Sequence, residues 1–245
     1  MVAMTAIYTR VAAPPVRPHP FGLFSVVPPL SPADEHWQAG VTWESWACLD
    51  PNTTVDPCIN GGSVVVKEFE QCPNTDQYKP ITVYLGVQNS GGSAEVAEQQ
   101  AQNVLADAEE FAVERWLYAQ LATAVTELPA SSAVWALARV EDALAKGYHG
   151  TGIIHLNRAL AVVLASQLVR AGTRVETVAG TPVAIGAGYD STAIYGTGSM
   201  SIMRGGAETS TAWNLSINDR LSLAERTYVV GWDCLAVGAS VTPPT

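Results

Sequence analysis

The clearest pattern in the chain is a run between residues 81 and 88 in which every second side chain is apolar: Ile81, Val83, Leu85 and Val87. A period of two predicts a β-strand with one apolar face. An earlier apolar run, Val64 to Phe69, predicts a second strand, and the turn residues 72–76 between them indicate a long β-hairpin. No partner strand precedes this hairpin, so we expect a neighbouring molecule to cover its apolar face.

The longest predicted element is a helix that follows Ser90-Gly91-Gly92. Ser93 is a helix-capping residue type, and Glu95 places a negative charge in the first turn. Apolar residues then recur at helical spacing: Ala97, Ala101, Val104, Ala108, Phe111 and Ala112. Since the next stop signal is Pro129, the helix would have about 35 residues and span on the order of 50 Å. Compact monomers rarely need such a helix, and the alternative is a kink near Gln120.

Shorter elements fill the rest of the chain in no regular order. Ser132 to Lys146 predicts a second helix that ends at Gly147, and a third helix is predicted from its cap at Asn157 to Gly172. Apolar or alternating runs predict five strands, at residues 174–178, 182–185, 194–204, 213–217 and 221–230. The last of these pairs with its predecessor across Asn218-Asp219. The mixture predicts an α+β fold.

The first 32 residues contain seven of the 15 prolines. Because proline lacks an N–H, this segment is predicted to be an extended arm to about Pro32, with neither a helix nor a central strand. Seven large apolar side chains interleave with the prolines: Val16, Phe21, Leu23, Phe24, Val26, Val27 and Leu30. Such a surface is unfavourable in water, so we expect the arm to become ordered only against another subunit.

Composition and charge exclude several classes of protein. With 245 residues, 48% of them hydrophobic and 15% charged, the chain can bury a large core and is not disordered. Its 13 Lys and Arg against 23 Asp and Glu give a net charge of −10, which disfavours tight nucleic-acid binding. The best membrane candidate, residues 159–169, is too short to cross a bilayer. The first ten residues lack the features of a secretory signal, so we expect synthesis in the cytoplasm.

The four cysteines, Cys48, Cys58, Cys72 and Cys234, have spacings that match no zinc-binding pattern. Since the cytoplasm is reducing, we expect free thiols. A Cys48–Cys58 disulfide across the intervening proline turns is the alternative.

Glycine and serine patterns of catalysis are missing. The glycine clusters 186–188 and 196–198 lack the third glycine of a dinucleotide-binding fingerprint and open no helix, so they are predicted to be turns or tight strand contacts. No GxSxG nucleophile motif occurs, and Ser199 lies inside a predicted strand.

Two histidines and three glutamates are the remaining candidates for chemistry. His149 and His155 could share a metal, but no third ligand is near them in sequence, so packed or surface positions are expected. Glu109, Glu110 and Glu114 lie on the predicted polar side of the long helix and are expected to be solvated. We therefore expect no catalytic residue, no cofactor site and no metal site.

Three segments carry a resemblance to a known family: Gly152–Arg158 (GIIHLNR), residues 176–189 (ETVAGTPV followed by GAGY) and Ala224–Trp232 (AERTYVVGW). They resemble stretches of the major capsid proteins of tailed bacteriophages with the Hong Kong ninety-seven-type fold, above all those of phages that infect actinobacteria. The order of arm, hairpin, long helix, α/β block and terminal β segment is similar as well. The resemblance covers the C-terminal 100 residues better than the rest.

This resemblance implies a shell subunit with five parts: an N-terminal arm (1–36), an extended loop with flanking strands (37–92), a spine helix (93–130), an axial domain (131–199) and a peripheral β segment (200–245). It implies self-assembly into the hexamers and pentamers of an icosahedral head around double-stranded DNA. The expected partners are other copies, a portal, and scaffolding or decoration proteins, with only loose contact to DNA. The expected location is the virion, with no membrane contact and no enzymatic activity.

Two other classes stay open. An encapsulin-like nanocompartment shell would share the fold and differ in its cargo. A small α/β enzyme would need a pocket with converging polar groups, which the sequence does not show. Some capsids of the resembled kind link a lysine to a neighbouring asparagine; Lys67 or Lys79 with Asn214 or Asn218 would be the nominal pairs. Nothing places a buried carboxylate beside them, so we expect no crosslink.

Overall fold

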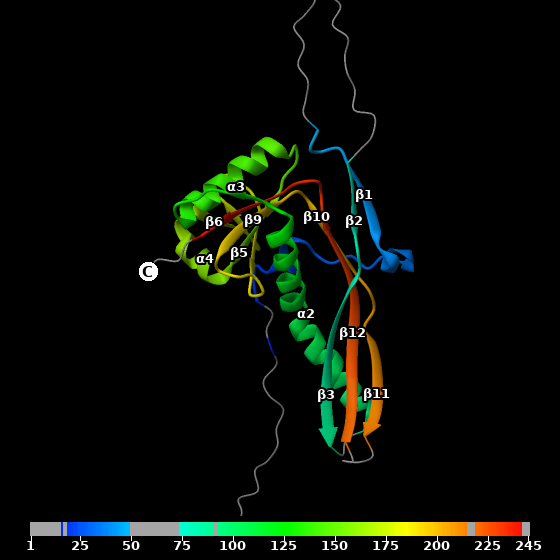
Figure 1. Ribbon diagram of the computed structural model, residues 1–245. Coiled ribbons are helices and arrows are strands. Elements are labelled where there is room, and N and C mark those ends of the chain that lie inside the picture. Colours follow the sequence, from blue (N-terminus) through cyan, green and yellow to red (C-terminus); the bar gives the residue numbers. More distant parts are fainter. Residues whose placement is uncertain (1–15, 17–18, 50–73, 91–92, 215–218, 242–245) are drawn as a thin grey trace, which may run out of the picture.

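Two lobes and a long helix make up the described part of the chain (Figure 1). The computed structural model describes residues 16, 19–49, 74–90, 93–214 and 219–241. Helix α2 (Ala94–Ala124) starts at the far end of an elongated lobe and ends in a globular lobe. Helices and strands are mixed without a regular βαβ series, so the predicted α+β class is confirmed.

The long helix predicted from the sequence is α2, which has 31 residues. Its N-terminus is capped as expected, because the Ser93 hydroxyl accepts a hydrogen bond from the Val96 N–H at 3.3 Å. The helix runs past Gln120 without interruption and ends at Ala124. It stops earlier than Pro129 requires because β4 (Thr126–Leu128) pairs in parallel with another strand.

A long sheet forms the elongated lobe. Its central strand, β12 (Asp219–Trp232), pairs antiparallel with β3 (Ile81–Ser90) on one side. Along its other side it pairs with β10 (Met200–Arg204) and then β11 (Glu208–Asn214). The pairing of β11 with β12 confirms that the last strand pairs with its predecessor, but β11 begins at Glu208, and residues 215–217 of the predicted strand lie outside the described ranges. The predicted strand 194–204 is instead two strands, because the chain leaves one sheet at Gly198 and enters this one at Met200.

The predicted hairpin of 64–69 with 81–87 is wrong in its turn and in the expected cover of its apolar face. Residues 81–87 do form a strand, but β3 pairs with β12, and its apolar residues Val83, Leu85 and Val87 pack against α2 of the same chain. No neighbour is needed to cover them. The predicted turn 72–76 overlaps β2 (Asn74–Tyr78), which pairs with β1 (Val41–Ser45), and residues 64–69 lie outside the described ranges.

Five strands form the sheet of the globular lobe, in the order β4, β13 (Ala236–Ser240), β9 (Ala193–Thr197), β5 (Ile153–Asn157) and β8 (Val183–Gly186). Helix α3 (Ala133–Gly147) packs on β9 and β13. Its buried Val140 and Leu144 join a core that includes Ile154, Leu156 and Ile194. The second predicted helix is therefore confirmed, and the Ser132 hydroxyl caps it by accepting the Trp135 N–H at 3.3 Å.

The third predicted helix is shorter than expected. Asn157 caps it, but α4 (Arg158–Val163) is followed by a 3-10 turn (Ala165–Gln167) and a hairpin of β6 (Leu168–Ala171) with β7 (Arg174–Thr177). Gly172 is the hairpin turn, with φ of +63°, and does not end a helix. Val169 pairs with Glu176 and Val175 with Arg170 in this ladder, and the β-branched side chains favour the strand over the helix.

The arm packs on its own subunit where the structure describes it. Leu23 begins a short helix, α1 (Leu23–Val26), and is fully buried. Leu30 donates its N–H to the Ile202 carbonyl at 2.8 Å, and its own carbonyl accepts the Arg204 N–H at 2.7 Å. A 3-10 helix, η1 (Glu35–Ala39), follows in the chain. The prediction of an arm that needs another subunit is therefore wrong for residues 19–32. Proline removes donors, but N–H groups such as those of Leu23, Phe24 and Leu30 find partners within this chain. Residues 1–15, 17 and 18 lie outside the described ranges.

Cys48 and Cys234 form a disulfide, with their Cα atoms 6.2 Å apart. The structure therefore differs from the predicted free thiols at these two positions, and the alternative of a Cys48–Cys58 bond is wrong. The two residues are 186 positions apart, so only the fold could reveal their proximity. Cys58 and Cys72 lie outside the described ranges.

Candidate functional site

Three glutamates near the middle of α2 join this helix to three other parts of the chain. We call Glu109, Glu110 and Glu114 the glutamate cluster. The sequence-based prediction of a solvated face is wrong, since Glu109 is 5% exposed and Glu114 is 2% exposed. One sequence signal could have revealed this: Glu109 interrupts a row of apolar residues spaced by four, which comprises Ala97, Ala101, Leu105, Val113, Leu117 and Leu121.

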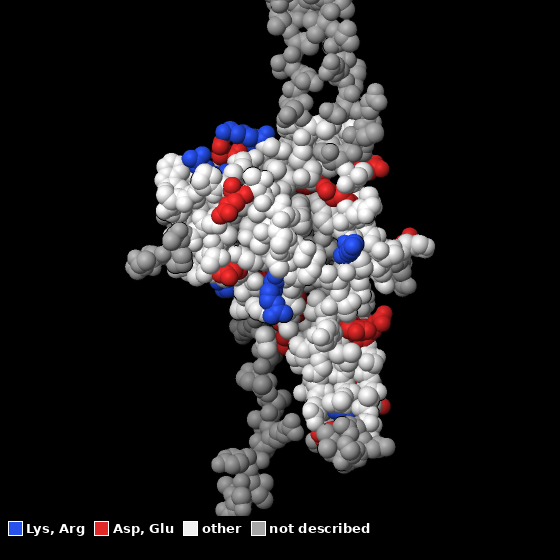
Figure 2. All heavy atoms as spheres, in the orientation of Figure 1, with Lys and Arg blue, Asp and Glu red and all other residues white. Residues whose placement is uncertain are grey.

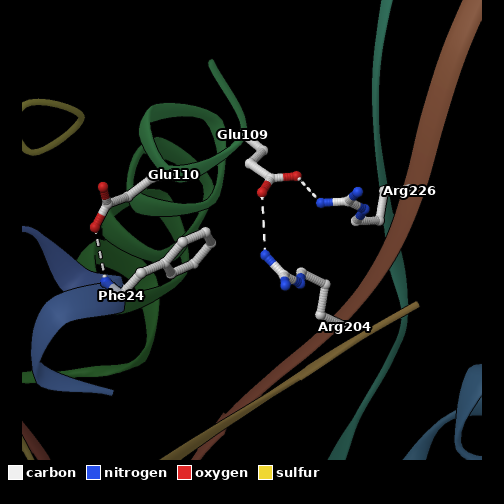
Figure 3. Close-up of polar contacts among 5 residues, drawn as sticks. All are labelled: Phe24, Glu109, Glu110, Arg204 and Arg226. Atoms are coloured by element: carbon white, nitrogen blue, oxygen red, sulfur yellow. Dashed lines mark hydrogen bonds and ion pairs between the residues drawn. The ribbon is translucent and has the colours of Figure 1, made fainter. Parts of the chain in front are cut away.

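Glu109 links the helix to the long sheet. Its carboxylate forms ion pairs with Arg204, at 3.3 Å, and with Arg226 on β12 (Figure 3). The Arg226 side chain is 17% exposed and that of Arg204 is 35% exposed. The three charges therefore lie between helix and sheet with little water, where an ion pair must satisfy its own charge.

Glu110 and Glu114 hold the arm. The Phe24 N–H donates to Glu110 at 2.7 Å, as Figure 3 shows, and the Leu23 N–H donates to Glu114 at 3.0 Å. Burial raises the pKa of both carboxyls, while these N–H donors act in the opposite direction. Two adjacent backbone donors of the arm are thus bound by carboxylates one helical turn apart.

Glu114 also binds the loop that follows β8. Its second oxygen accepts the Gly188 N–H at 2.9 Å. A Cβ at Gly188 would lie 2.5 Å from the Phe111 carbonyl oxygen, and one at Gly186 would lie 2.6 Å from the Glu114 carboxyl carbon. The prediction of tight contacts at glycines 186–188 is confirmed, and the reason is the close approach of this loop to α2.

The two histidines lie apart and have different environments. His155 is buried on β5 between the hydroxyls of Tyr189 and Thr197, each 3.1 Å away, and burial lowers its pKa to about 3. His149 is exposed and contacts the Leu49 carbonyl at 2.7 Å. Among the described residues, no group of three or more His, Cys, Asp or Glu is placed to hold a metal ion. Ser199 lies between β9 and β10, and its hydroxyl donates to the Thr151 carbonyl at 3.3 Å.

A hollow of about 420 Å³ lies beside the glutamate cluster, between the arm and α2. The carboxylates beside this hollow bind backbone N–H groups and arginines of the same chain. The glutamate cluster therefore acts as a structural joint. No helix in the described ranges is both long and apolar enough to cross a membrane.

The exposed surface offers apolar side chains for contact with other molecules. Charged groups are sparse on the face drawn in Figure 2. In the globular lobe, six large apolar side chains are between 47% and 77% exposed: Val134, Trp135, Val162, Val163, Val169 and Val178. They come from α3, α4 and the β6–β7 hairpin region, and burying such side chains against another molecule would be favourable.

Known proteins resemble this chain in structure. No protein-family model and no curated protein sequence matches it. A structure from Mycobacterium phage Che8 is 12% identical and superposes with a TM-score of 0.57 over 97% of both chains. The capsid of the native GTA particle is 12% identical, with a TM-score of 0.62 over 98% of this chain and 96% of that one. The mature capsid of bacteriophage PhiM1 is 11% identical, with a TM-score of 0.52 over 100% and 93% of the two chains.

At these identities the likeness shows the fold. It covers nearly the whole of each chain. The Hong Kong ninety-seven-type capsid fold expected from the resemblance is confirmed.

Proposed function

We propose that this chain is the major capsid protein of a tailed bacteriophage, which assembles into an icosahedral head around double-stranded DNA. The observation that carries the proposal is the full-length likeness to the capsids of the native GTA particle and of bacteriophage PhiM1. The exposed apolar side chains of the globular lobe support it, because assembly would bury them. The subunit acts as a structural building block of the virion and not as an enzyme.

Within the proposed shell, each part of the chain has a distinct role. The axial domain around the capsomer centre comprises residues 131–199 together with β4 and β13, because these two strands pair within its sheet. Helix α2 is the spine of the peripheral domain, whose sheet consists of β10, β11, β12 and β3. The extended loop, predicted within 37–92, includes β1 and β2, whereas β3 belongs to the long sheet. The expected partners are copies of the chain in hexamers and pentamers, a portal, and scaffolding or decoration proteins. The net charge of −10 would keep contact with packaged DNA loose.

Assembly of the purified full chain tests this proposal. Sedimentation and negative-stain microscopy should show closed shells, alone or with its genomic neighbours co-expressed. A strictly monomeric species at high concentration under both conditions would contradict it. Shells that enclose a specific protein and no DNA in their native host would instead indicate a nanocompartment.

A surface variant makes the test specific. Val162 is 77% exposed in the subunit, so Val162→Asp should keep the circular dichroism spectrum and melting temperature but block assembly. Val162→Thr keeps the β-branched shape without a charge and should still assemble. If both variants assembled equally well, α4 would not lie in a subunit contact.

A further inference from the structure

The Cys48–Cys234 disulfide joins two turns, each of which is also held by hydrogen bonds to another part of the chain. The His149 N–H donates to the Ala47 carbonyl at 2.9 Å, and the His149 ring contacts the Leu49 carbonyl on the other side of Cys48. Cys48 is therefore flanked on both sides by hydrogen bonds to one residue. These hydrogen bonds do not involve the sulfur atoms, so we expect them to hold the turn in position in the reduced protein as well.

The turn that holds Cys234 is fixed in the same way. Asp233 donates its N–H to the Ser199 carbonyl at 2.8 Å, and the Leu235 carbonyl accepts the Gly198 N–H at 2.9 Å. Between them the backbone of Cys234 has φ of +29°, a conformation that non-glycine residues adopt only when their surroundings impose it. Two thiols on such turns have a high effective concentration toward each other.

Both cysteines are open to small reagents. Each is partly exposed, and Cys234 lines a groove of about 610 Å³ between β2, α2 and the β12–β13 turn. A low-molecular-weight thiol or disulfide can therefore reach the pair without unfolding of the chain.

The disulfide also links the end of β1 to the end of the central strand β12. Residue 48 follows β1 by three positions, and β1 pairs with β2. Tyr78 of β2 contacts Trp232 edge-on, with ring centroids 5.3 Å apart, and donates its hydroxyl to the Trp232 carbonyl. The β1–β2 pair is thus attached to the end of β12 at two points, one aromatic and one covalent.

We propose that Cys48 and Cys234 form a redox latch, defined as a pair of thiols during synthesis and assembly that becomes a disulfide when the particle meets an oxidising medium. The proposal rests on the function proposed above, which takes the chain from a reducing cytoplasm to the outside of a cell. The co-reactant is a low-molecular-weight disulfide. One cysteine thiolate attacks it and releases one thiol, and the other cysteine then attacks the mixed disulfide and releases a second thiol. Two protein thiols and one small disulfide thus become one protein disulfide and two small thiols.

Closing the latch should stabilise the subunit. The bond spans 186 positions of sequence, and crosslinks that close long loops restrict the unfolded chain most. We expect oxidation to raise the melting temperature by on the order of 10 °C. Cys48→Ser and Cys234→Ser should each abolish this difference, whereas the double variant Cys58→Ser/Cys72→Ser keeps the pair and should retain it.

Thiol trapping tests the latch directly. Cells that express the full chain are treated with N-ethylmaleimide before lysis, and modified cysteines are identified by peptide mass spectrometry. Positions 48 and 234 should both be modified in this sample and should both be protected after the purified protein has been incubated with oxidised glutathione. A pair that is already linked in the cells, a pair that stays reduced with oxidised glutathione, or an unchanged melting temperature on oxidation would each overturn the proposal.

The same samples separate the latch from the capsid function. Microscopy scores shell formation by reduced and oxidised protein. Shells without the redox response would refute the latch alone, whereas the redox response without shells under any condition would refute the capsid function and leave a redox-controlled link in the subunit.

Discussion

The carboxylate of Glu114 accepts the backbone N–H of Leu23 at 3.0 Å, and both residues are almost completely buried. Ninety-one positions separate them, so this bond fixes the N-terminal segment to the middle of the long helix. Its neighbours extend the joint, because Glu110 binds the next N–H of the arm and Glu109 binds two arginines at the long sheet. The described part of the arm therefore binds to a site on its own subunit.

Loss of the Glu114 side chain should destabilise the subunit strongly. Glu114→Ala leaves the N–H groups of Leu23 and Gly188 buried without a partner, which costs about 2–4 kcal/mol. Urea unfolding followed by circular dichroism measures this. Asp107→Ala removes an exposed carboxylate from the same helix and should change stability by less than about 0.5 kcal/mol. Equal effects of the two variants would contradict the joint.

The two arginines that bind Glu109 should differ in importance. Arg226 is the more buried, so Arg226→Ala, which leaves the buried Glu109 with one partner, should cost more than Arg204→Ala. Glu109→Ala leaves two cations facing each other and should cost the most, about 3–5 kcal/mol. Unfolding free energies of the three variants give the order, and a larger loss for Arg204→Ala than for Arg226→Ala would refute it.

Local pattern was sufficient for most of the regular elements. The cap at Ser93, the helical spacing after Ala97 and the alternation from Ile81 to Val87 each specify their element without reference to the rest of the chain. Element boundaries followed less well, because Thr126 and Leu168 begin strands whose partners decide where the preceding helices end.

The joint at the glutamate cluster could not be predicted in the same way. An isolated Glu114 on a helix indicates a solvated face, and only the three-dimensional fold shows two N–H donors from residues 91 and 74 positions away. The disulfide has the same character, since the spacing of Cys48 and Cys234 carries no information about distance. Contacts of β3 with β12 and α2 are equally non-local. The apolar face of residues 81–87 was therefore expected to need a neighbouring molecule, whereas α2 of the same chain covers it.

His155 should make the subunit acid-sensitive. Burial lowers its pKa to about 3 in the folded state, against about 6.5 when unfolded, so the unfolded chain binds more protons between these values. The free energy of unfolding that His155 contributes is fully present above pH 6.5. It falls as the pH decreases and is about 2 kcal/mol lower at pH 5. Glutamine does not titrate, so between pH 7 and pH 5 the unfolding free energy of His155→Gln, measured in urea, should fall by about 2 kcal/mol less than that of the parent. An unchanged pH slope in the variant would show that the imidazole is protonated in the fold.

Glu110 should have the opposite effect on the pH dependence of stability. Burial and the charges of Glu114 and Glu109 raise its pKa, so the folded state binds a proton more readily than the unfolded chain, and this group destabilises the fold as the pH rises above about 4.5. Glu110→Gln keeps an oxygen for the Phe24 N–H and removes the charge. It should therefore stabilise the subunit slightly at pH 7, by up to about 1 kcal/mol, and give no gain near pH 4. A clear loss of stability at pH 7 would show that the charge itself holds the arm.

The closest approach of a loop to the long helix gives the last prediction. A Cβ at Gly188 would lie 2.5 Å from the Phe111 carbonyl oxygen and 2.7 Å from the Arg115 nitrogen, and both are backbone atoms that cannot rotate away. Gly188→Ala should therefore push the loop off α2 and break its hydrogen bond to Glu114, with a loss of about 2–4 kcal/mol or failure to fold. Gly206→Ala is the matched control, because nothing lies within 4 Å of its Cβ position, and this variant should stay within about 0.5 kcal/mol of the parent. Thermal and urea unfolding of both variants decide the matter. If Gly188→Ala were as stable as Gly206→Ala, the loop would have room to move, and its contact with the glutamate cluster would not be what positions the globular lobe on the helix.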